Sequence, residues 1–188
     1  FALEIGRRGG AVLCSDIVLA AAEETAALVR QRGGQAWACH CDVSDLDQVE
    51  AMACRADEVL PAPVDLVINN AGVGVGGTPI GEVAIDDWHW TLGINLWGVI
   101  HGSHVFVPRL RKAGRGGIIN VASTAGFSAA PLMGPYNVTK AGALALTETL
   151  AAELAGSGVA VTALCPTLVK TNINANGRIV GDSSRLFD

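Results

Sequence analysis

Short apolar segments alternate along this chain with longer segments that carry helical patterns. Strands are predicted for five apolar runs, over residues 11–14, 36–41, 64–69, 117–121 and 159–165. Helices are predicted between them, over residues 19–31, 46–60, 86 or 87 to 112, and 136–155. The strand runs are almost continuously apolar, which is typical of a sheet covered on both faces. The alternation predicts an α/β protein with a doubly wound parallel sheet, in three layers α/β/α.

The length of 188 residues predicts one domain, residues 1–188. The chain begins without Met, and Phe1 to Arg8 has the pattern of the second half of a helix, ended by Gly9 and Gly10. No clear element is predicted from Gly181 onward. We therefore expect the sequence to be part of a longer chain, with the fold incomplete at both ends.

Charge and composition exclude several classes of protein. The chain carries 13 basic and 18 acidic residues, so we do not expect unspecific nucleic-acid binding. The longest uncharged run contains Asn, Ser and Pro and is not a membrane span. Five cysteines scattered in apolar segments indicate a reducing compartment and a cytoplasmic protein. Neither Cys39-His40-Cys41 nor the pair His101 and His104 has the further ligands of a metal site, so no metal is expected.

Acidic residues follow the first two predicted strands, where parallel sheets bind their ligands. Asp16 could accept hydrogen bonds from both hydroxyls of an adenosine ribose and would repel a 2′-phosphate, which favours NAD over NADP. The alternative is that Asp16 caps the next helix. Asp42 could bind the amino group of adenine while Val43 covers the ring, and a helix-capping turn explains Asp42 equally well.

A glycine-rich stretch follows the third predicted strand. Residues 72–77 match the letters G-x-G-x-x-G of a dinucleotide-binding turn. Thr78 and Pro79 interrupt the position where the phosphate-binding helix of such a turn opens. We therefore predict a loop that lets a ligand approach the backbone closely, and not a phosphate-binding turn.

The fourth predicted strand is followed by Ser123, and a helix that starts with Tyr136 comes soon after. Lys140 lies four residues beyond Tyr136, so the two side chains share one helix face, one turn apart. A Tyr-x-x-x-Lys spacing alone is weak evidence. Its place directly after a loop that carries a serine from a strand end is more specific.

Together these residues resemble the short-chain dehydrogenase/reductase family. The resemblance rests on blocks in the family's order: Asn69-Asn70-Ala71-Gly72, Asn95 within Ile94-Asn95-Leu96-Trp97-Gly98, Ser123, Tyr136 with Lys140, and Pro166 with Thr171. It implies a Rossmann-like fold and a catalytic tetrad of Asn95, Ser123, Tyr136 and Lys140. It also implies a nicotinamide cofactor, contacted by Asp16, Asp42, Val43, Asn69, Ala71, Gly72, Tyr136, Lys140, Pro166, Val169 and Thr171.

The chain departs from the family pattern in three places. The motif T-G-x-x-x-G-x-G is absent, so the first predicted strand here would be the family's second. Thr167 stands where the family usually has Gly after Pro166, which could alter the loop over the nicotinamide. The family's last strand and its substrate-covering helices are not recognisable after Arg178.

The resemblance implies that Tyr136 acts as general acid/base. A free phenol is almost wholly protonated at neutral pH, and the positive charge of Lys140 favours the phenolate. Ser123 would bind the substrate oxygen, and Asn95 would hold a water that links Lys140 to solvent. The alternatives are a packing role for Tyr136 and a helix kink at Asn95.

The segment from Gly126 to Pro135 carries no charge and predicts a fairly apolar alcohol or carbonyl substrate. Extra apolar surface on the two longest helices predicts a homo-oligomer, and the family resemblance implies a tetramer or a dimer. The sequence therefore predicts an NAD-dependent enzyme acting on CH–OH groups. A dinucleotide-sensing module of the same fold that has lost catalysis is the alternative.

Overall fold

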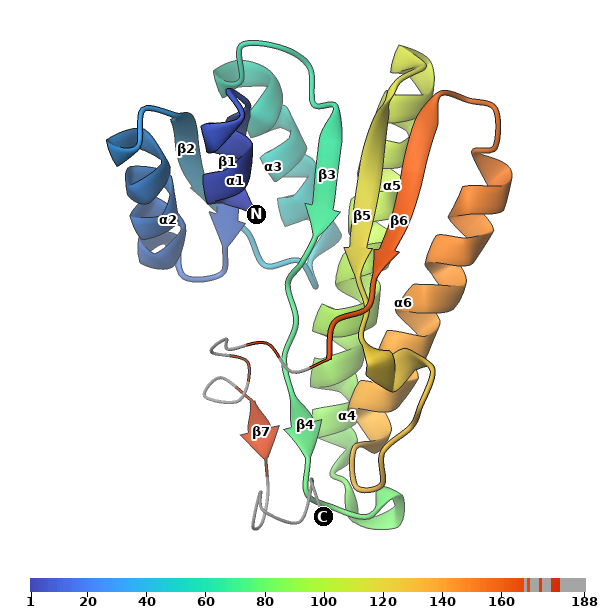
Figure 1. Ribbon diagram of the computed structural model, residues 1–188. Helices are drawn as coiled ribbons and strands as arrows, with labels where there is room; N and C mark the ends of the chain where they lie inside the picture. Colours follow the sequence, from blue (N-terminus) through green and yellow to red (C-terminus); the bar gives the residue numbers. More distant parts are fainter. Residues whose placement is uncertain (168, 170–172, 174–176, 180–188) are drawn as a thin grey trace. The chain divides into compact units, whose positions relative to one another are not determined.

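The computed structural model describes residues 1–167, 169, 173 and 177–179, and the chain divides into two compact units, Phe1–Asp65 and Leu66–Asp188. Each unit is built from parallel strands and helices (Figure 1). Among the described residues, no helix has the length and apolarity needed to cross a membrane.

The first unit holds a two-stranded parallel sheet and three helices. Its elements in chain order are α1 (Ala2–Arg7), β1 (Ala11–Asp16), α2 (Leu19–Gln31), β2 (Gln35–His40) and α3 (Leu46–Val59). Strands β1 and β2 pair in register from Ala11 with Gln35 to Asp16 with His40. The buried residues of helix α2 are Ala22, Ala26 and Val29. They form one core cluster with Cys14 of β1 and Ala36 of β2.

The second unit holds a three-stranded parallel sheet in the order β3-β5-β6. These strands are β3 (Leu66–Asn69), β5 (Gly116–Val121) and β6 (Val159–Leu164). A separate parallel pair joins β4 (Val75–Gly76) to β7 (Arg178–Ile179). The helices are η1 (Ile80–Glu82), α4 (Ile85–Leu92), η2 (Gly93–Trp97), α5 (Gly98–Ala113), η3 (Thr124–Gly126) and α6 (Gly134–Glu153).

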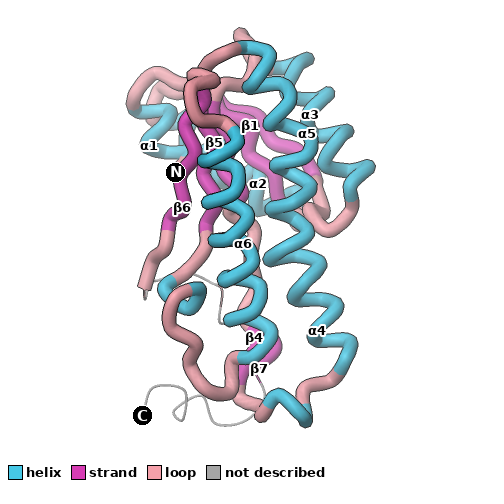
Figure 2. The backbone as a smooth tube through the Cα atoms, turned by 90° about the vertical axis from the view of Figure 1, so that its right-hand side faces the viewer, coloured by secondary structure: helices cyan, strands magenta, loops and turns pink. Residues whose placement is uncertain are grey.

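Helix α6 positions most of the candidate site. It packs against α4 and segment η2 and against strands β5 and β6, and Figure 2 shows it running beside the rod formed by α4 and α5. Pro135 lies in its first turn, where a missing N–H costs no helical hydrogen bond. Buried residues Thr139, Lys140, Ala143 and Thr147 form one stripe along the helix.

The structure corrects the predicted elements in two places. The helix predicted from residue 86 or 87 to 112 begins at Ile85, and its middle, Gly93–Trp97, is a π-helix. A π segment holds one residue more than an α turn, and the apolar periodicity of the sequence does not show it. The glycine-rich loop also contains strand β4, whose pairing with β7 is a contact between segments far apart in sequence.

Candidate active site

Asn95 lies in the π segment and is completely buried. Its Oδ1 accepts a hydrogen bond from the Val73 N–H at 2.8 Å, and its Nδ2 donates to the Val73 carbonyl at 2.8 Å and to Thr139 Oγ1 at 3.3 Å. One amide therefore fixes the loop after β3 and also contacts α6. The water that Asn95 would hold stays a prediction. The π segment is an irregularity of the helix at Asn95, which agrees with the alternative of a helix kink.

Lys140 lies on the buried face of α6 and is 3% exposed. Its Nζ donates to the Val121 carbonyl at 2.8 Å. Burial lowers the pKa of Lys140 to about 8, and the nearby Cys165 opposes this shift slightly. A Cβ added at Gly72 would lie 3.5 Å from both Lys140 Nζ and Asn95 Oδ1, so Gly72 adjoins both polar groups.

Tyr136 is half-buried near the start of α6. Lys140 Nζ lies 5.7 Å from the centroid of its ring, within range of a cation–π contact. The carbonyl of Tyr136 accepts a hydrogen bond from Thr139 Oγ1 at 2.8 Å. The predicted spacing therefore brings the phenol and the ammonium group to one face of the helix.

Ser123 follows β5 and is buried at the start of the short helix η3. Its Oγ accepts a hydrogen bond from the Ala125 N–H at 3.2 Å, so its hydroxyl proton is free to point elsewhere. A Cβ at Gly126 would lie 2.9 Å from the Lys140 carbonyl. The absence of a side chain at Gly126 lets the serine loop lie directly against α6 at Lys140.

The predicted cofactor residues that lie at the end of β3 and after β6 have different surroundings. Asn69 Nδ2 donates to Asn120 Oδ1 at 2.8 Å, so this amide points to the neighbouring strand. Ala71 is exposed and Gly72 is half-buried. Pro166 is half-buried, and its carbonyl accepts from the Thr124 N–H at 3.1 Å, which ties it to the serine loop.

The last predicted cofactor residue that the structure describes is Val169, which is 60% exposed. Thr171 lies outside the described residues. Thr167, which stands where the family has Gly, is exposed.

The first unit carries Asp16, Asp42 and Val43. Asp16 ends β1, is exposed, and accepts a hydrogen bond from the Val18 N–H at 2.8 Å through Oδ1. Asp42 Oδ1 accepts from both the N–H and the hydroxyl of Ser44, at 2.9 and 2.7 Å. Val43 is half-buried. Both acids thus form tight local turns, and one carboxylate oxygen of each is not used in these bonds. The helix-capping alternatives are wrong in detail, because the N-cap residues of α2 and α3 are Val18 and Asp45.

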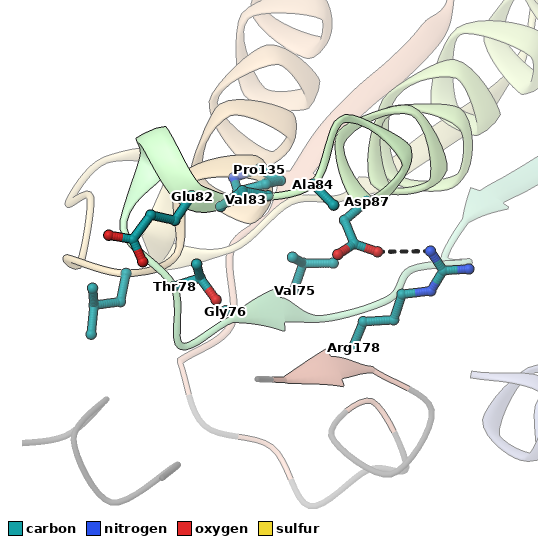
Figure 3. Close-up of a pocket in the computed structure, with 10 residues that line it drawn as sticks. Val75, Gly76, Thr78, Glu82, Val83, Ala84, Asp87, Pro135 and Arg178 are labelled. Carbon is teal, nitrogen blue, oxygen red and sulfur yellow. Dashed lines mark hydrogen bonds and ion pairs between the residues drawn. The ribbon is translucent and has the colours of Figure 1, made fainter. Parts of the chain in front are cut away.

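A small pocket of about 170 Å³ lies near the N-terminal end of α6 (Figure 3). Its wall is mostly apolar, and Leu132 and Pro135 come from the uncharged segment predicted to face the substrate. At one side the Arg178 guanidinium pairs with Asp87 at 2.7 Å (Figure 3). The Arg178 Cζ also lies 4.2 Å from the centroid of the Trp90 ring. This contact attaches β7 to α4.

Sequence reasoning missed four contributors to this site: Val73, Thr139, Asn120 and Thr147. Val73 contributes only backbone groups, so no side-chain pattern could reveal it. Thr139 and Thr147 lie on the same helical stripe as Lys140, and polar residues on the buried stripe of an alanine-rich helix were an available signal.

The chain belongs to the short-chain dehydrogenase family: the family profile described as "short chain dehydrogenase" matches residues 1–179. The predicted Rossmann-like α/β fold is confirmed by a solved short-chain dehydrogenase/reductase from Burkholderia phymatum, determined in complex with NAD. That structure has a TM-score of 0.88 and 37% identity, over 93% of this chain and 63% of that chain.

Two curated relatives are similar over most of the chain. The probable oxidoreductase EphD of Mycobacterium tuberculosis is 38% identical over 175 residues, which are 93% of this chain and 29% of that protein. The meso-2,3-butanediol dehydrogenase of Serratia marcescens is 36% identical over 165 residues, 88% of this chain and 64% of that protein. The chain thus spans less than two thirds of the length of each of these relatives.

Proposed function

We propose that this protein is an NAD-dependent oxidoreductase that interconverts an alcohol and a ketone or aldehyde on a fairly apolar small molecule. The observation that carries the proposal is the buried Lys140 ammonium group beside the ring of Tyr136 on one helix face. The Serratia relative, named as a butanediol dehydrogenase, supports the reaction class, and the NAD complex of the Burkholderia protein supports the cofactor.

The surroundings of Lys140 fit the ribose of a nicotinamide cofactor. An ammonium group has three protons, and Val121 accepts one of them. Further protons can therefore be donated to hydroxyl oxygens, and Gly72 adds no side chain beside Nζ. We expect the cofactor to be held in this unit by Asn69, Ala71, Gly72, Tyr136, Lys140, Pro166, Val169 and Thr171. When bound, NAD supplies the hydride acceptor or donor.

The chain's own residues handle the proton. The Tyr136 phenolate oxygen accepts the proton of a substrate alcohol as general base, and the phenol returns this proton to the carbonyl oxygen in the reverse direction. Ser123 keeps its hydroxyl proton available and donates it to the substrate oxygen, which steadies the charge that develops there.

Asp16 is proposed to select NAD. Its carboxylate is exposed at the end of β1, and the Val18 N–H uses only Oδ1. The second oxygen can accept the hydrogen bonds of a ribose, and its charge repels a 2′-phosphate. Asp42 and Val43 are proposed to contact adenine.

The decisive test is Tyr136→Phe, which removes only the hydroxyl. We expect kcat to fall by about 10²- to 10⁴-fold, while the Kd for NADH stays within about twofold because the aromatic ring remains. Thr149→Val, which removes an exposed hydroxyl from the same helix, is the matched control. Unchanged turnover in Tyr136→Phe would contradict the acid/base role. Tight NADH binding by the wild type without turnover of small alcohols or ketones would favour the sensing module.

Assembly and location are further parts of the proposal. Exposed apolar side chains in the second unit include Trp97, Phe127 and Val138, and we propose a homo-oligomer, a tetramer or a dimer, that covers such surface. The five cysteines are free thiols, which supports a cytoplasmic location. Light scattering coupled to size-exclusion chromatography tests the assembly, and a strictly monomeric mass would contradict it. The single-domain interpretation of residues 1–188 stays a prediction.

A further inference from the structure

A chain of hydrogen-bonded polar side chains, half-buried at Asn69 and buried at Asn120 and Thr147, links strands β3 and β5 to helix α6. Asn120 of β5 is completely buried; its Oδ1 accepts from Asn69 Nδ2 at 2.8 Å, and its Nδ2 donates to Thr147 Oγ1 at 3.0 Å. The Thr147 hydroxyl donates in turn to the Ala143 carbonyl at 2.6 Å. The oxygen and the nitrogen of the Asn120 amide are thus both bonded.

Helix α5 also leaves room for these polar side chains. A Cβ at Gly102 of α5 would overlap the Asn69 amide oxygen. Helix α5 therefore has no side chain where Asn69 lies against it. Apolar side chains could fill such a space without any need for hydrogen-bond partners, so the bonded amides of Asn69 and Asn120 specify a geometry that apolar packing alone would not.

A second polar contact joins the same strand to the same helix. Val121, the neighbour of Asn120, accepts the hydrogen bond of Lys140 Nζ at 2.8 Å. Lys140 and Thr147 lie seven residues apart on α6, two turns along one face, or about 10 Å along the helix axis. Strand β5 thus holds α6 at two points, and a helix displaced along its axis could not keep both bonds.

We propose that Asn120 and Thr147 are positioning residues that set the axial position of α6 against β5. Because Ser123 follows the end of β5 and Tyr136 and Lys140 are on α6, this position decides how the phenol and the ammonium group meet the serine. Thr147 touches no substrate in this scheme and acts only through the helix. The inference rests on the proposed function for its effect on turnover, although the positioning itself does not depend on it.

The test is Thr147→Val, which keeps the shape of the side chain and leaves Asn120 Nδ2 without its acceptor. We expect kcat to fall by about tenfold to a hundredfold, the range that a small misplacement of reacting groups causes, with the KM for the cofactor within about twofold. Thr147→Ser keeps the hydroxyl and should restore kcat to within about threefold of the wild type. If Thr147→Val does not fold, Thr147→Ala replaces it in the same comparison.

Thr149→Val is the matched control. Thr149 lies on the same helix and makes the same type of bond, to the Ala145 carbonyl at 2.9 Å, but it is exposed. This variant should retain wild-type kcat. A fall in kcat equal to that of Thr147→Val would overturn the proposal, as would a loss in Thr147→Val that Thr147→Ser does not restore.

A readout without turnover separates this inference from the proposed function. Tyr136 is the one tyrosine of this sequence, so isotope-labelled tyrosine gives an NMR ring signal that Tyr136→Phe assigns. We expect Thr147→Val to move this signal and Thr149→Val to leave it in place. An inactive wild type with this pattern would refute the proposed function and support the positioning role. An active wild type whose ring signal and kcat are unaffected by Thr147→Val would refute the positioning role alone.

Discussion

The two units hold their predicted site residues in different ways. Asp16 and Asp42 of the first unit bond to groups two residues further along the chain. Asn95 and Lys140 of the second unit are buried and bond to partners 22 and 19 residues away. The acids need only a local turn to be in place, whereas the buried groups depend on the whole unit being folded. We therefore expect substitutions in the second unit to have the larger effects.

The largest effect is expected for Lys140→Met. The variant removes the charge beside Tyr136 and the bond to Val121, and we expect kcat/KM to fall by about 10³-fold, the middle of the range for loss of an acid/base contribution. Lys112→Met, at an exposed position near the end of α5, is the matched control and should have little effect. Steady-state kinetics measure kcat/KM for both variants. Equal values for Lys140→Met and Lys112→Met would contradict the expected difference between buried and exposed positions.

Alkaline pH should act on the two units in opposite directions. Burial lowers the pKa of Lys140 from 10.5 to about 8, so between these values the unfolded chain binds the extra proton and stability rises with pH. Burial raises the pKa of Cys41 from 9.0 to about 11, so over that window the folded chain keeps the proton and stability falls with pH.

The measurement is the free energy of unfolding against pH for the wild type, Lys140→Met and Cys41→Ser. In the wild type, the lowered pKa of Lys140 should raise the free energy of unfolding by about 3 kcal/mol between pH 8 and 10.5, and Lys140→Met should not show this rise. The raised pKa of Cys41 should lower the free energy of unfolding of the wild type above pH 9, and Cys41→Ser should not show this fall. Parallel curves for the three proteins would show that neither group is as desolvated as the structure indicates.

Gly102→Ala tests the packing around Asn69. The added methyl group would overlap the Asn69 amide, and we expect about 1–3 kcal/mol of destabilisation, as for other overpacked interiors. Gly81→Ala is the control, because a Cβ placed there meets no atom within 4 Å beyond its own segment of the chain. Chemical denaturation measures both variants, and similar stabilities would mean that the amide moves aside freely.

The smallest effect is expected in the first unit. Asp16→Asn keeps an oxygen for the Val18 N–H and removes the charge, so stability should change by less than about 0.5 kcal/mol. The ratio of the Kd values for NADPH and NADH should fall, because the repulsion of a 2′-phosphate is lost. Fluorescence titration with both cofactors checks this, and wild-type binding of NADPH tighter than NADH would refute the role of Asp16.

The contrast between partners that are near and far in sequence explains which features could be predicted from the sequence. Alternating strands and helices, and the one-turn spacing of Tyr136 and Lys140, follow from local periodicity and could be predicted. The local turns at Asp16 and Asp42 were also accessible, because their partners are two residues away, although the N-cap residues are Val18 and Asp45. The contact of Asn95 with Val73 could not be predicted, because it joins an amide to backbone groups that carry no sequence signature.

Side-chain patterns also hid two features of the second unit. The π geometry at Asn95 adds one residue without breaking the apolar character of the helix. The pairing of Val75 with Arg178 is a contact between segments about a hundred residues apart, and a two-residue strand has no periodicity to detect. Thr147, by contrast, left a readable signal in the stripe that it shares with Lys140.

The additional residue in Gly93–Trp97 has a consequence for any shortened version of this chain. One residue corresponds to a rotation of about 100° around a helix axis, so the π segment sets the angular phase of α4 relative to α5. Deleting Ile94 would restore a regular α-helix. It would also rotate α4 about its axis relative to α5, so that Asp87 and Trp90 turn away from Arg178. A more regular helix would thus detach β7 from α4.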